Sequence, residues 1–233
     1  MTLLDAIVES GSPPAADAAQ ATKKRYSEVL SAKMAVAVSE GLRGAGFPRV
    51  NPVPGGPHEK AFQGGLGPKK VDVSYADEQH GLLLAVSIKS INSPPFGKNL
   101  KNRFGDLCTE AVTPHMRFPY SVVCGMFLFP AAADEDITPA RPVSTFRRAT
   151  KLFATISGRE DHMDPAERFE NFTMVLFQPV APGAPGPWLK LFDVVTEQQV
   201  AEPDYFLTLR EIYNRRNPHA AIGEGAPEGA EQQ

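Results

Sequence analysis

Two short runs of alternating apolar and polar residues stand near the middle of the chain, at positions 71–76 and 82–89. Both are rich in residues that favour strands, and the polar stretch between them ends in Gly81, which is typical of a β-hairpin. If residues 78–81 form a four-residue loop, position 72 lies opposite position 87. The pattern therefore predicts a hairpin with a defined register.

Successive side chains alternate between the two faces of such a hairpin. One face is predicted to hold three polar side chains, Asp72, Ser87 and Lys89, and the other four apolar ones, Val71, Val73, Val86 and Ile88. A carboxylate and an ammonium on a buried face are unfavourable unless they pair or bind something. The cluster is thus either a partly exposed ion pair or part of a functional site.

The remaining apolar pattern predicts helices and strands in alternation. A four-residue spacing predicts a helix over residues 22–45, with the stripe Tyr26, Leu30, Met34, Val38 and Leu42. Further helices are expected over 98–113, 145–156 and 203–216, and a short one at Asp164-Pro165. Apolar runs predict strands over 120–129, 172–177 and 188–194. Together with the hairpin, these elements predict an α/β fold.

Composition indicates a single domain that is flanked by two terminal segments without regular structure. Residues 1–20 are expected to form a flexible N-terminal arm, and residues 21–219 a single domain. Residues 220–233 are rich in Gly, Ala and Glu and are expected to be disordered. Within the domain, residues 47–67 are rich in Pro and Gly and are predicted to form an irregular loop.

Charge is distributed unevenly along the chain, whose net charge is −3. Residues 23–117 hold 14 Lys and Arg against 8 Asp and Glu, whereas the remainder holds 10 against 19. The basic part contains the hairpin, and this favours a local phosphate-binding surface. A solvated mixed surface would show a weaker form of the same asymmetry.

No membrane-spanning or targeting segment is recognisable. No uninterrupted apolar run approaches the ~20 residues that a bilayer-spanning helix needs, and the first residues lack the pattern of a signal peptide. The two cysteines, Cys108 and Cys124, lack metal-site spacing and are expected to be buried thiols. We therefore expect a cytoplasmic protein with no membrane association.

The hairpin belongs to a longer run, GPKKVDVSYADEQHGLLLAVSIKSIN, which is followed by GKNLKNRFGDLCTEAV. This region resembles the core of the PD-(D/E)xK nuclease superfamily, and it is similar to restriction-endonuclease-like proteins of bacteria. In that pattern an Asp on one strand is followed by x-Ile-Lys at the end of the next strand, and then by a helix. The resemblance implies a restriction-endonuclease-like core, a central mixed β-sheet flanked by helices.

The resemblance also implies a Mg²⁺ site. Asp72 would be the principal ligand and the backbone carbonyl of Ile88 another, while Lys89 would orient the attacking water and contact the scissile phosphate. Two departures stand out. Ser87 occupies the position of the acid that normally opens the (D/E)xK triplet, and the Pro of the PD pair is displaced to Pro68. Some restriction enzymes with Ser or Thr at that point take the acid from the following helix.

Two helices offer an acid to complete such a site. On the helix after the hairpin we prefer Glu110 to Asp106, although an ion-pair ladder with Arg103 explains both acids equally well. On the first helix we prefer Glu40 to Glu28 because Glu40 lies nearer the apolar flank. The alternative for Glu28 and for Glu40 is a solvated surface acid with no role in a metal site. Ser87 would hydrogen-bond a metal-bound water.

Three functions are compatible with these residues. The first is a Mg²⁺-dependent DNA endonuclease of bacterial restriction or another anti-phage defence system, acting as a homodimer, with Mn²⁺ able to substitute. The second is a catalytically inactive nuclease fold that binds nucleic acid or a partner protein. The third is a nuclease that cuts RNA or acts only with defence-system partner proteins. We assign nucleic-acid contacts to five cations, Lys69, Lys70, Lys98, Lys101 and Arg103.

Overall fold

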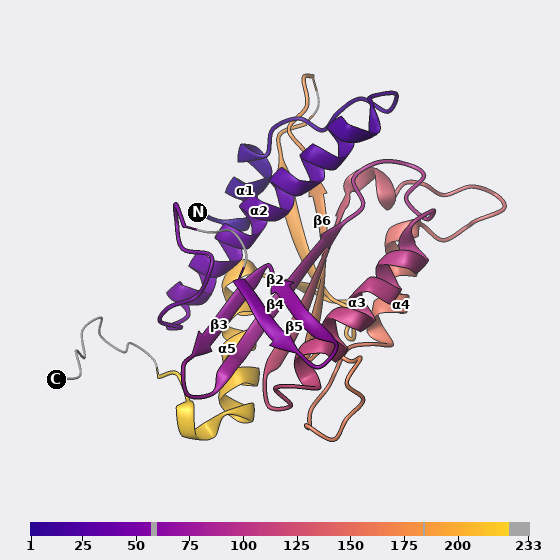
Figure 1. The fold of residues 1–233 in the computed structure, drawn as a ribbon. Helices are drawn as coiled ribbons and strands as arrows, with labels where there is room; N and C mark the ends of the chain where they lie inside the picture. The colour runs from indigo at the N-terminus through magenta and orange to yellow at the C-terminus, as the bar shows by residue number, and fades with distance from the viewer. Residues whose placement is uncertain (57–59, 184, 224–233) are drawn as a thin grey trace.

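The computed structural model describes residues 1–56, 60–183 and 185–223 of the chain (Figure 1). Its α-helices are α1 (Leu3–Glu9), α2 (Gln20–Gly44), α3 (Leu100–His115), α4 (Thr145–Ala154) and α5 (Glu202–Arg216). Its strands are β1 (Lys60–Gly64), β2 (Gly67–Val71), β3 (Val73–Asp77), β4 (Gly81–Ser90), β5 (Val122–Pro130), β6 (Asn171–Gln178), β7 (Trp188–Asp193) and β8 (Gln199–Val200). Two short 3-10 helices are η1 (Ala131–Ala133) and η2 (Pro218–Ala220). The α/β class is confirmed.

Strands β3 to β8 form one mixed sheet in the order β3-β4-β5-β6-β7-β8. The central strands β4, β5 and β6 run parallel, whereas β3, β7 and β8 pair antiparallel with their neighbours. β5 is buried along its whole length, as its nearly continuous apolar sequence predicts for a strand covered on both faces. A central mixed sheet flanked by helices is thus confirmed.

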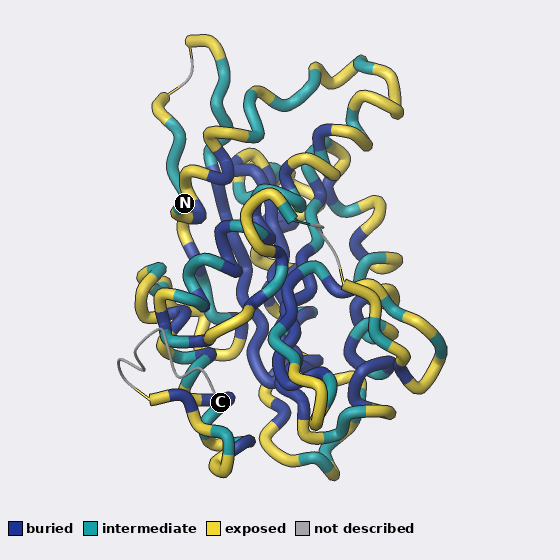
Figure 2. Tube along the Cα trace, turned by 60° about the vertical axis from the view of Figure 1, so that its left-hand side comes forward, coloured by how far each residue is buried: buried dark blue, intermediate teal, exposed yellow. Residues whose placement is uncertain are grey.

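The two faces of the sheet enclose two hydrophobic cores. Helices α1, α2 and α5 complete one core and helices α3 and α4 the other. Alternate residues of β5 supply both, so that Cys124 and Met126 belong to the first core and Val123 and Phe127 to the second. Figure 1 shows α2 on the left of the sheet and α3 and α4 on the right. Figure 2 shows the buried strands in the middle of the molecule.

The hairpin of β3 and β4 has the register that the sequence predicts. Val73 pairs with Val86, which places Asp72 opposite Ser87. The turn differs from the expected one, because it holds three residues, 78–80, rather than four. A β-bulge within the hairpin compensates for the shorter turn and restores the register.

The strand predicted over residues 71–76 is interrupted at Asp72. β2 ends at Val71 and β3 begins at Val73. Val71 packs in the core beneath α3, whereas Val73 packs in the core beneath α2. The placement of Val71 on the same face as Val73 was wrong, because the break at Asp72 ends the two-residue alternation.

Part of the region predicted as an irregular loop, residues 47–67, forms a two-stranded ribbon of β1 and β2. The ribbon lies against α3, where the Gly65 N–H donates to the Thr113 carbonyl oxygen at 2.8 Å. A Cβ atom at Gly64 would lie 2.6 Å from that oxygen, so the close approach requires glycine. Residues 57–59 lie outside the described part of the chain.

The N-terminal arm is not the flexible segment that its composition suggested. Residues 3–9 form α1, whose Leu3 and Ile7 side chains are fully buried. A capping box opens this helix: Thr2 Oγ1 accepts from the Asp5 N–H, and the Asp5 carboxylate accepts from the Thr2 N–H. Of the tail expected to be disordered, residues 224–233 lie outside the described part, and Ile222 is buried.

Smaller corrections concern helix ends and cysteines. Helix α3 continues through Pro114 to His115, and no helix forms at Asp164-Pro165, where the chain makes turns. Cys124 is buried as expected, whereas Cys108 is partly exposed. Within the described residues, no helix combines the length and apolar character needed to cross a bilayer.

A buried cluster of charges, which the sequence analysis missed, ties α5 to the start of β5 and β6. The Glu170 carboxylate accepts from Arg159 Nη1 at 2.7 Å and from the Val123 N–H at 2.8 Å. His115 Nε2 lies 3.3 Å from the same carboxylate, and Arg216 Nη2 lies 3.8 Å from it. Because the side chains of Glu170 and His115 are wholly buried, this cluster is a structural element rather than an accessible site.

Candidate active site

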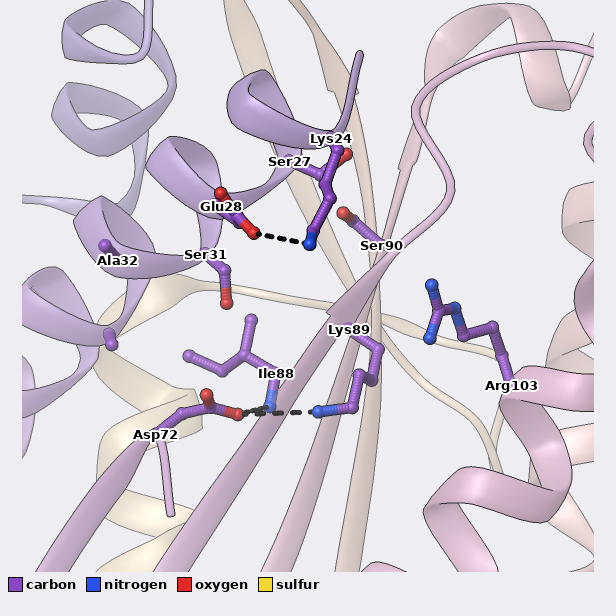
Figure 3. Close-up of a pocket in the computed structure, with 11 residues that line it drawn as sticks. Lys24, Ser27, Glu28, Ser31, Ala32, Asp72, Ile88, Lys89, Ser90 and Arg103 are labelled. Atoms are coloured by element: carbon purple, nitrogen blue, oxygen red, sulfur yellow. Dashed lines mark hydrogen bonds and ion pairs between the residues drawn. The ribbon is translucent and has the colours of Figure 1, made fainter. Parts of the chain in front are cut away.

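Asp72 occupies the break between β2 and β3, where its side chain turns toward the end of β4. Its Oδ2 atom accepts a hydrogen bond of 2.7 Å from the Ile88 N–H and lies 4.0 Å from Lys89 Nζ (Figure 3). The register of the hairpin thus brings together the Asp and the Lys that the sequence singled out. The carboxylate is held against the strand that supplies Ile88 and Lys89.

Glu110 reaches the same cluster from α3. Ser87 Oγ donates a hydrogen bond to its Oε2 atom, while Lys89 Nζ and Lys69 Nζ each lie 2.9 Å from its Oε1 atom. The structure therefore places an acid of the helix that follows the hairpin beside Ser87. Asp106 lies elsewhere, paired with Arg103 at 3.1 Å on the protein surface.

The charges of this cluster stabilise one another. Burial alone would lower the pKa of the Lys89 ammonium, but the carboxylates of Glu110 and Asp72 outweigh it and raise that pKa above its ordinary value. Burial alone would raise the pKa of Glu110, but the charge of Lys89 and hydrogen bonds from Ser87, Lys89 and Lys69 lower it. At neutral pH, Lys89 is therefore a cation and Glu110 an anion.

The first helix offers a different acid from the one preferred on sequence grounds. Glu40 pairs with the amino terminus of Met1 and does not line the cavity beside Asp72. Glu28 does line that cavity, where its carboxylate lies 3.6 Å from Lys24 Nζ. The two acids are 12 residues apart, or about 18 Å along a helix. The assignment of Glu40 to the metal site is thus not supported, because only Glu28 lies at the correct end of α2.

A cavity of about 350 Å³, which we call the inner cavity, opens between α2 and the end of β4. Asp72, Ile88 and Lys89 form its floor (Figure 3). Glu28 and Lys24 line it from α2, and Arg103 extends toward it from α3. Two carboxylates, two ammonium groups and a guanidinium thus surround one solvent-accessible space.

The five cations assigned to nucleic acid are not all in one place. Lys69 binds Glu110 and belongs to the carboxylate cluster. Arg103 lines the inner cavity, and Lys98 lines a second cavity next to it. Lys70 and Lys101 are exposed and line neither cavity. The cations of this set that face the cavities are therefore Lys98 and Arg103.

The donor atoms available for a metal ion are few. Among the described residues, no group of three or more His, Cys, Asp or Glu side chains is arranged to hold a metal. Asp72 and Glu110 supply two carboxylates, both close to Lys89 Nζ, and β4 supplies the Ile88 carbonyl. Oxygen donors of this kind are the ligands that Mg²⁺ prefers, since it keeps several waters and takes one or two carboxylates together with phosphate oxygens. Glu110 itself is held by Ser87, Lys89 and Lys69 and is not among the residues that line the inner cavity.

Comparisons with models of protein families, with curated proteins and with solved structures find no match to this chain. The function is therefore inferred from the geometry of the site. That geometry combines the carboxylates of Asp72 and Glu110 with the charged Lys89, beside a cavity whose wall carries both acids and cations.

Proposed function

We propose that this protein is a Mg²⁺-dependent endonuclease that hydrolyses DNA phosphodiester bonds, with Asp72, Glu110 and Lys89 as its central residues. The observation that carries the proposal is the position of Glu110, whose carboxylate binds Ser87 Oγ and Lys89 Nζ. It supports the use of a helix-borne acid in place of the acid missing at position 87. The mixed sheet, with a hairpin followed by α3, is compatible with a restriction-endonuclease-like core.

The carboxylates of Asp72 and Glu110 and the backbone carbonyl of Ile88 would hold Mg²⁺, and Mn²⁺ can substitute. When bound, the ion supplies positive charge for the phosphorane-like transition state and lowers the pKa of a bound water. Ser87 cannot replace a carboxylate charge, but its hydroxyl holds the Glu110 carboxylate in place. Ser87 is therefore a positioning residue for the acid and would also bind a metal-bound water.

Lys89 contributes a fixed positive charge. Because its pKa is raised, it is protonated at neutral pH and cannot accept the proton of the attacking water. Its ammonium instead donates hydrogen bonds, to a phosphate oxygen and to the oxygen of the nucleophile, and thereby favours the hydroxide form. Such preorganised charge in a partly buried site stabilises the developing negative charge of the transition state.

The proposal is tested by incubating plasmid DNA with the purified protein in Mg²⁺, Mn²⁺ or EDTA. Metal-dependent cutting is expected in the wild type, and Asp72→Ala, Lys89→Ala and Glu110→Gln are expected to abolish it. Asp106→Asn and Glu40→Gln are matched controls, since both remove an acid outside the site, and both should cut normally. Thermal unfolding must show that all variants are folded. A folded wild type that does not cut DNA would overturn the proposal.

A non-catalytic function is the second candidate, and one observation favours it. Lys69 and Lys89 already pair with Glu110, so a metal ion has to compete with two ammonium groups for this carboxylate. In that case the protein would bind nucleic acid or a partner protein without cutting. Cleavage assays with RNA, and with added defence-system proteins, should be run in parallel with DNA. Cleavage in either assay indicates a nuclease that cuts RNA or requires a partner, whereas binding without cleavage in all of them indicates the non-catalytic function.

We further propose a role in bacterial restriction or another anti-phage defence. Cleavage of both strands of a duplex would use a homodimer, because a palindromic site has the symmetry of a two-fold dimer. Sedimentation analysis with and without DNA tests the oligomeric state separately from the chemistry.

A further inference from the structure

The inner cavity continues into a second cavity of about 590 Å³, which we call the outer cavity. The two share a boundary formed by Lys24, Ser27, Ser90 and Arg103, which line both. The outer cavity extends from this boundary between the start of α2 and the segment of residues 90–99 that leads into α3. A continuous groove therefore leads away from Asp72 and Lys89.

The two parts of the groove differ in charge. The inner cavity has acids in its wall, Asp72 and Glu28, in addition to its cations. Among the residues that the structure describes, the charged residues that line the outer cavity are Lys23, Lys24, Lys98 and Arg103, with no Asp or Glu. Carboxylates suit a metal ion, whereas a wall of cations without acids suits an anion such as a phosphate group. The charge pattern thus assigns different ligands to neighbouring parts of one groove.

The cations of the outer cavity keep donors for a ligand. Lys23 Nζ donates one hydrogen bond to the Ala16 carbonyl oxygen at 2.6 Å, which leaves two of its three N–H groups for a ligand. Lys98 makes no ion pair among the described residues. Within the described part of the chain, the ion pairs of Lys24 and Arg103 are with exposed acids, Glu28 at 3.6 Å and Asp106 at 3.1 Å. Exposed pairs of this kind contribute about 0–1 kcal/mol, so a phosphate group can replace them at little cost.

The walls of the outer cavity are linked to each other. Asn92 Nδ2 donates to Ser27 Oγ of α2 at 2.9 Å and to Ser90 Oγ at 2.8 Å. The Lys98 N–H donates to the Pro95 carbonyl oxygen at 3.1 Å, which closes the turn before α3. These bonds hold the segment that carries Lys98 against the helix that carries Lys23 and Lys24. The cavity is therefore a preformed part of the structure.

We propose that the outer cavity is a second phosphodiester-binding subsite, which holds the backbone of the substrate strand next to the phosphate cleaved in the inner cavity. The assignment rests on the proposed function for the identity of the inner site, but its own basis is the cationic wall. Lys98 and Lys23 bind the flanking phosphate, and Lys24 and Arg103 lie at the boundary between the two phosphates. The ligand chemistry, a phosphodiester, is common to DNA and RNA.

Binding of short DNA and RNA oligonucleotides in EDTA, followed by fluorescence anisotropy, tests the subsite without catalysis. Lys98→Gln is expected to weaken binding several-fold and to reduce the slope of log K against log salt by about one, as for loss of one phosphate contact. Lys151→Gln is the matched control, because Lys151 is exposed on α4 and lines neither cavity. Equal effects of the two substitutions would overturn the proposal.

A series of oligonucleotides, each with one neutral methylphosphonate, locates the contact. One position should weaken binding by the wild type and have no additional effect on Lys98→Gln, since both changes remove the same contact. Additive effects at every position would overturn the subsite. The nucleic acid that binds with the higher affinity, DNA or RNA, identifies the substrate class.

The two proposals fail in different ways. A wild type that binds through Lys98 but never cuts overturns the nuclease and supports the subsite. A wild type that cuts, with binding unaffected by Lys98→Gln, overturns the subsite alone. A wild type that binds neither DNA nor RNA overturns both.

Discussion

The Glu110 carboxylate accepts a hydrogen bond from the hydroxyl of Ser87, across the junction between helix α3 and strand β4. One partner is the residue that departs from the (D/E)xK pattern, and the other is an acid that lies 23 positions later in the chain. In the proposed nuclease, this contact allows α3 to supply the acid that the pattern normally has on the strand.

This contact predicts that the acid can be exchanged between the two positions. Glu110→Ser alone should reduce cleavage by two or more orders of magnitude, because it removes a carboxylate that would hold the metal ion. The double substitution Ser87→Glu with Glu110→Ser returns the acid to the strand and should recover a large part of the activity. Cleavage rates under saturating Mg²⁺ measure both effects.

The control for the exchange is Ser87→Glu by itself, which places two acids side by side and should not exceed the wild type. Binding of Mn²⁺, measured by calorimetry, provides a readout that does not depend on cleavage. A double variant as inactive and as weak in Mn²⁺ binding as Glu110→Ser would contradict the proposed role of Glu110.

The same carboxylate predicts a pH dependence of stability. Because the pKa of Glu110 is lowered in the folded protein, its contribution is present above the ordinary value of 4.5 and is lost as pH falls through the folded value. In EDTA, the wild type should therefore lose more free energy of unfolding below about pH 4.5 than Glu110→Gln does. Urea unfolding of both proteins between pH 3 and 7, covering this range, measures the difference.

Lys89 predicts a loss of stability at the alkaline end of the pH range. Its pKa is raised, so its contribution is fully present below the ordinary value of 10.5 and is lost as pH rises through the folded value. In strong alkali the wild type should therefore lose free energy of unfolding, whereas Lys89→Met, which has no ammonium to deprotonate, should not show this loss. If the free energy of unfolding changed with pH in the same way in the wild type and in both variants, at acidic and at alkaline pH, the stabilising ion pair of Lys89 and Glu110 would be contradicted.

The sequence was sufficient to place Asp72, Ser87 and Lys89 together. The register of Val73 with Val86 is the predicted one, as strand alternation requires. The turn is one residue shorter than predicted, and the β-bulge in the hairpin offsets that difference. The side assigned to Val71 was wrong, because alternation assumes an unbroken strand. Nothing in the local residue pattern marked the break at Asp72.

The choice of acids could not be made in the same way. Periodicity shows which positions of a helix face outward, but it does not show which end of the helix lies at the site. Glu28 and Glu40 both lie off the apolar stripe of α2, and only the packing of α2 on the sheet brings Glu28 to the cavity. Helix α1 could have been predicted from the sequence. Thr2 and Asp5 have the spacing of a capping box, but the composition of residues 1–20 was taken to indicate a flexible arm.

Two glycines in helices predict opposite effects of the same substitution. A Cβ atom at Gly41 of α2 would lie 2.1 Å from the Phe206 ring of α5, so Gly41→Ala forces these helices apart. We expect a loss of about 1–3 kcal/mol, as for other overpacked cores. A Cβ at Gly105 of α3 meets nothing within 4 Å, and Gly105→Ala should gain up to about 1 kcal/mol from helix propensity. Denaturant unfolding of both variants provides the comparison.

The buried charge of Glu170 predicts a large cost for a conservative change. Glu170→Gln keeps the size of the side chain but leaves Arg159, whose side chain is 1 % exposed, without a carboxylate partner. Breaking a buried pair by removing one charge typically costs about 3–5 kcal/mol, because the remaining charge is desolvated without compensation. The free energy of unfolding at pH 7 measures this loss.

Glu167→Gln serves as the control for this substitution, since Glu167 is exposed in the same segment and its change should stay within about 0.5 kcal/mol. Glu170 also accepts from the Val123 N–H at the start of β5. The neutral amide oxygen of Gln is a weaker acceptor than a carboxylate, so hydrogen exchange of that amide should become faster in the variant. Equal stability of Glu170→Gln and wild type would mean that the attraction between the charges only balances their desolvation. The cluster would then contribute no net stability to the junction of β5, β6 and α5.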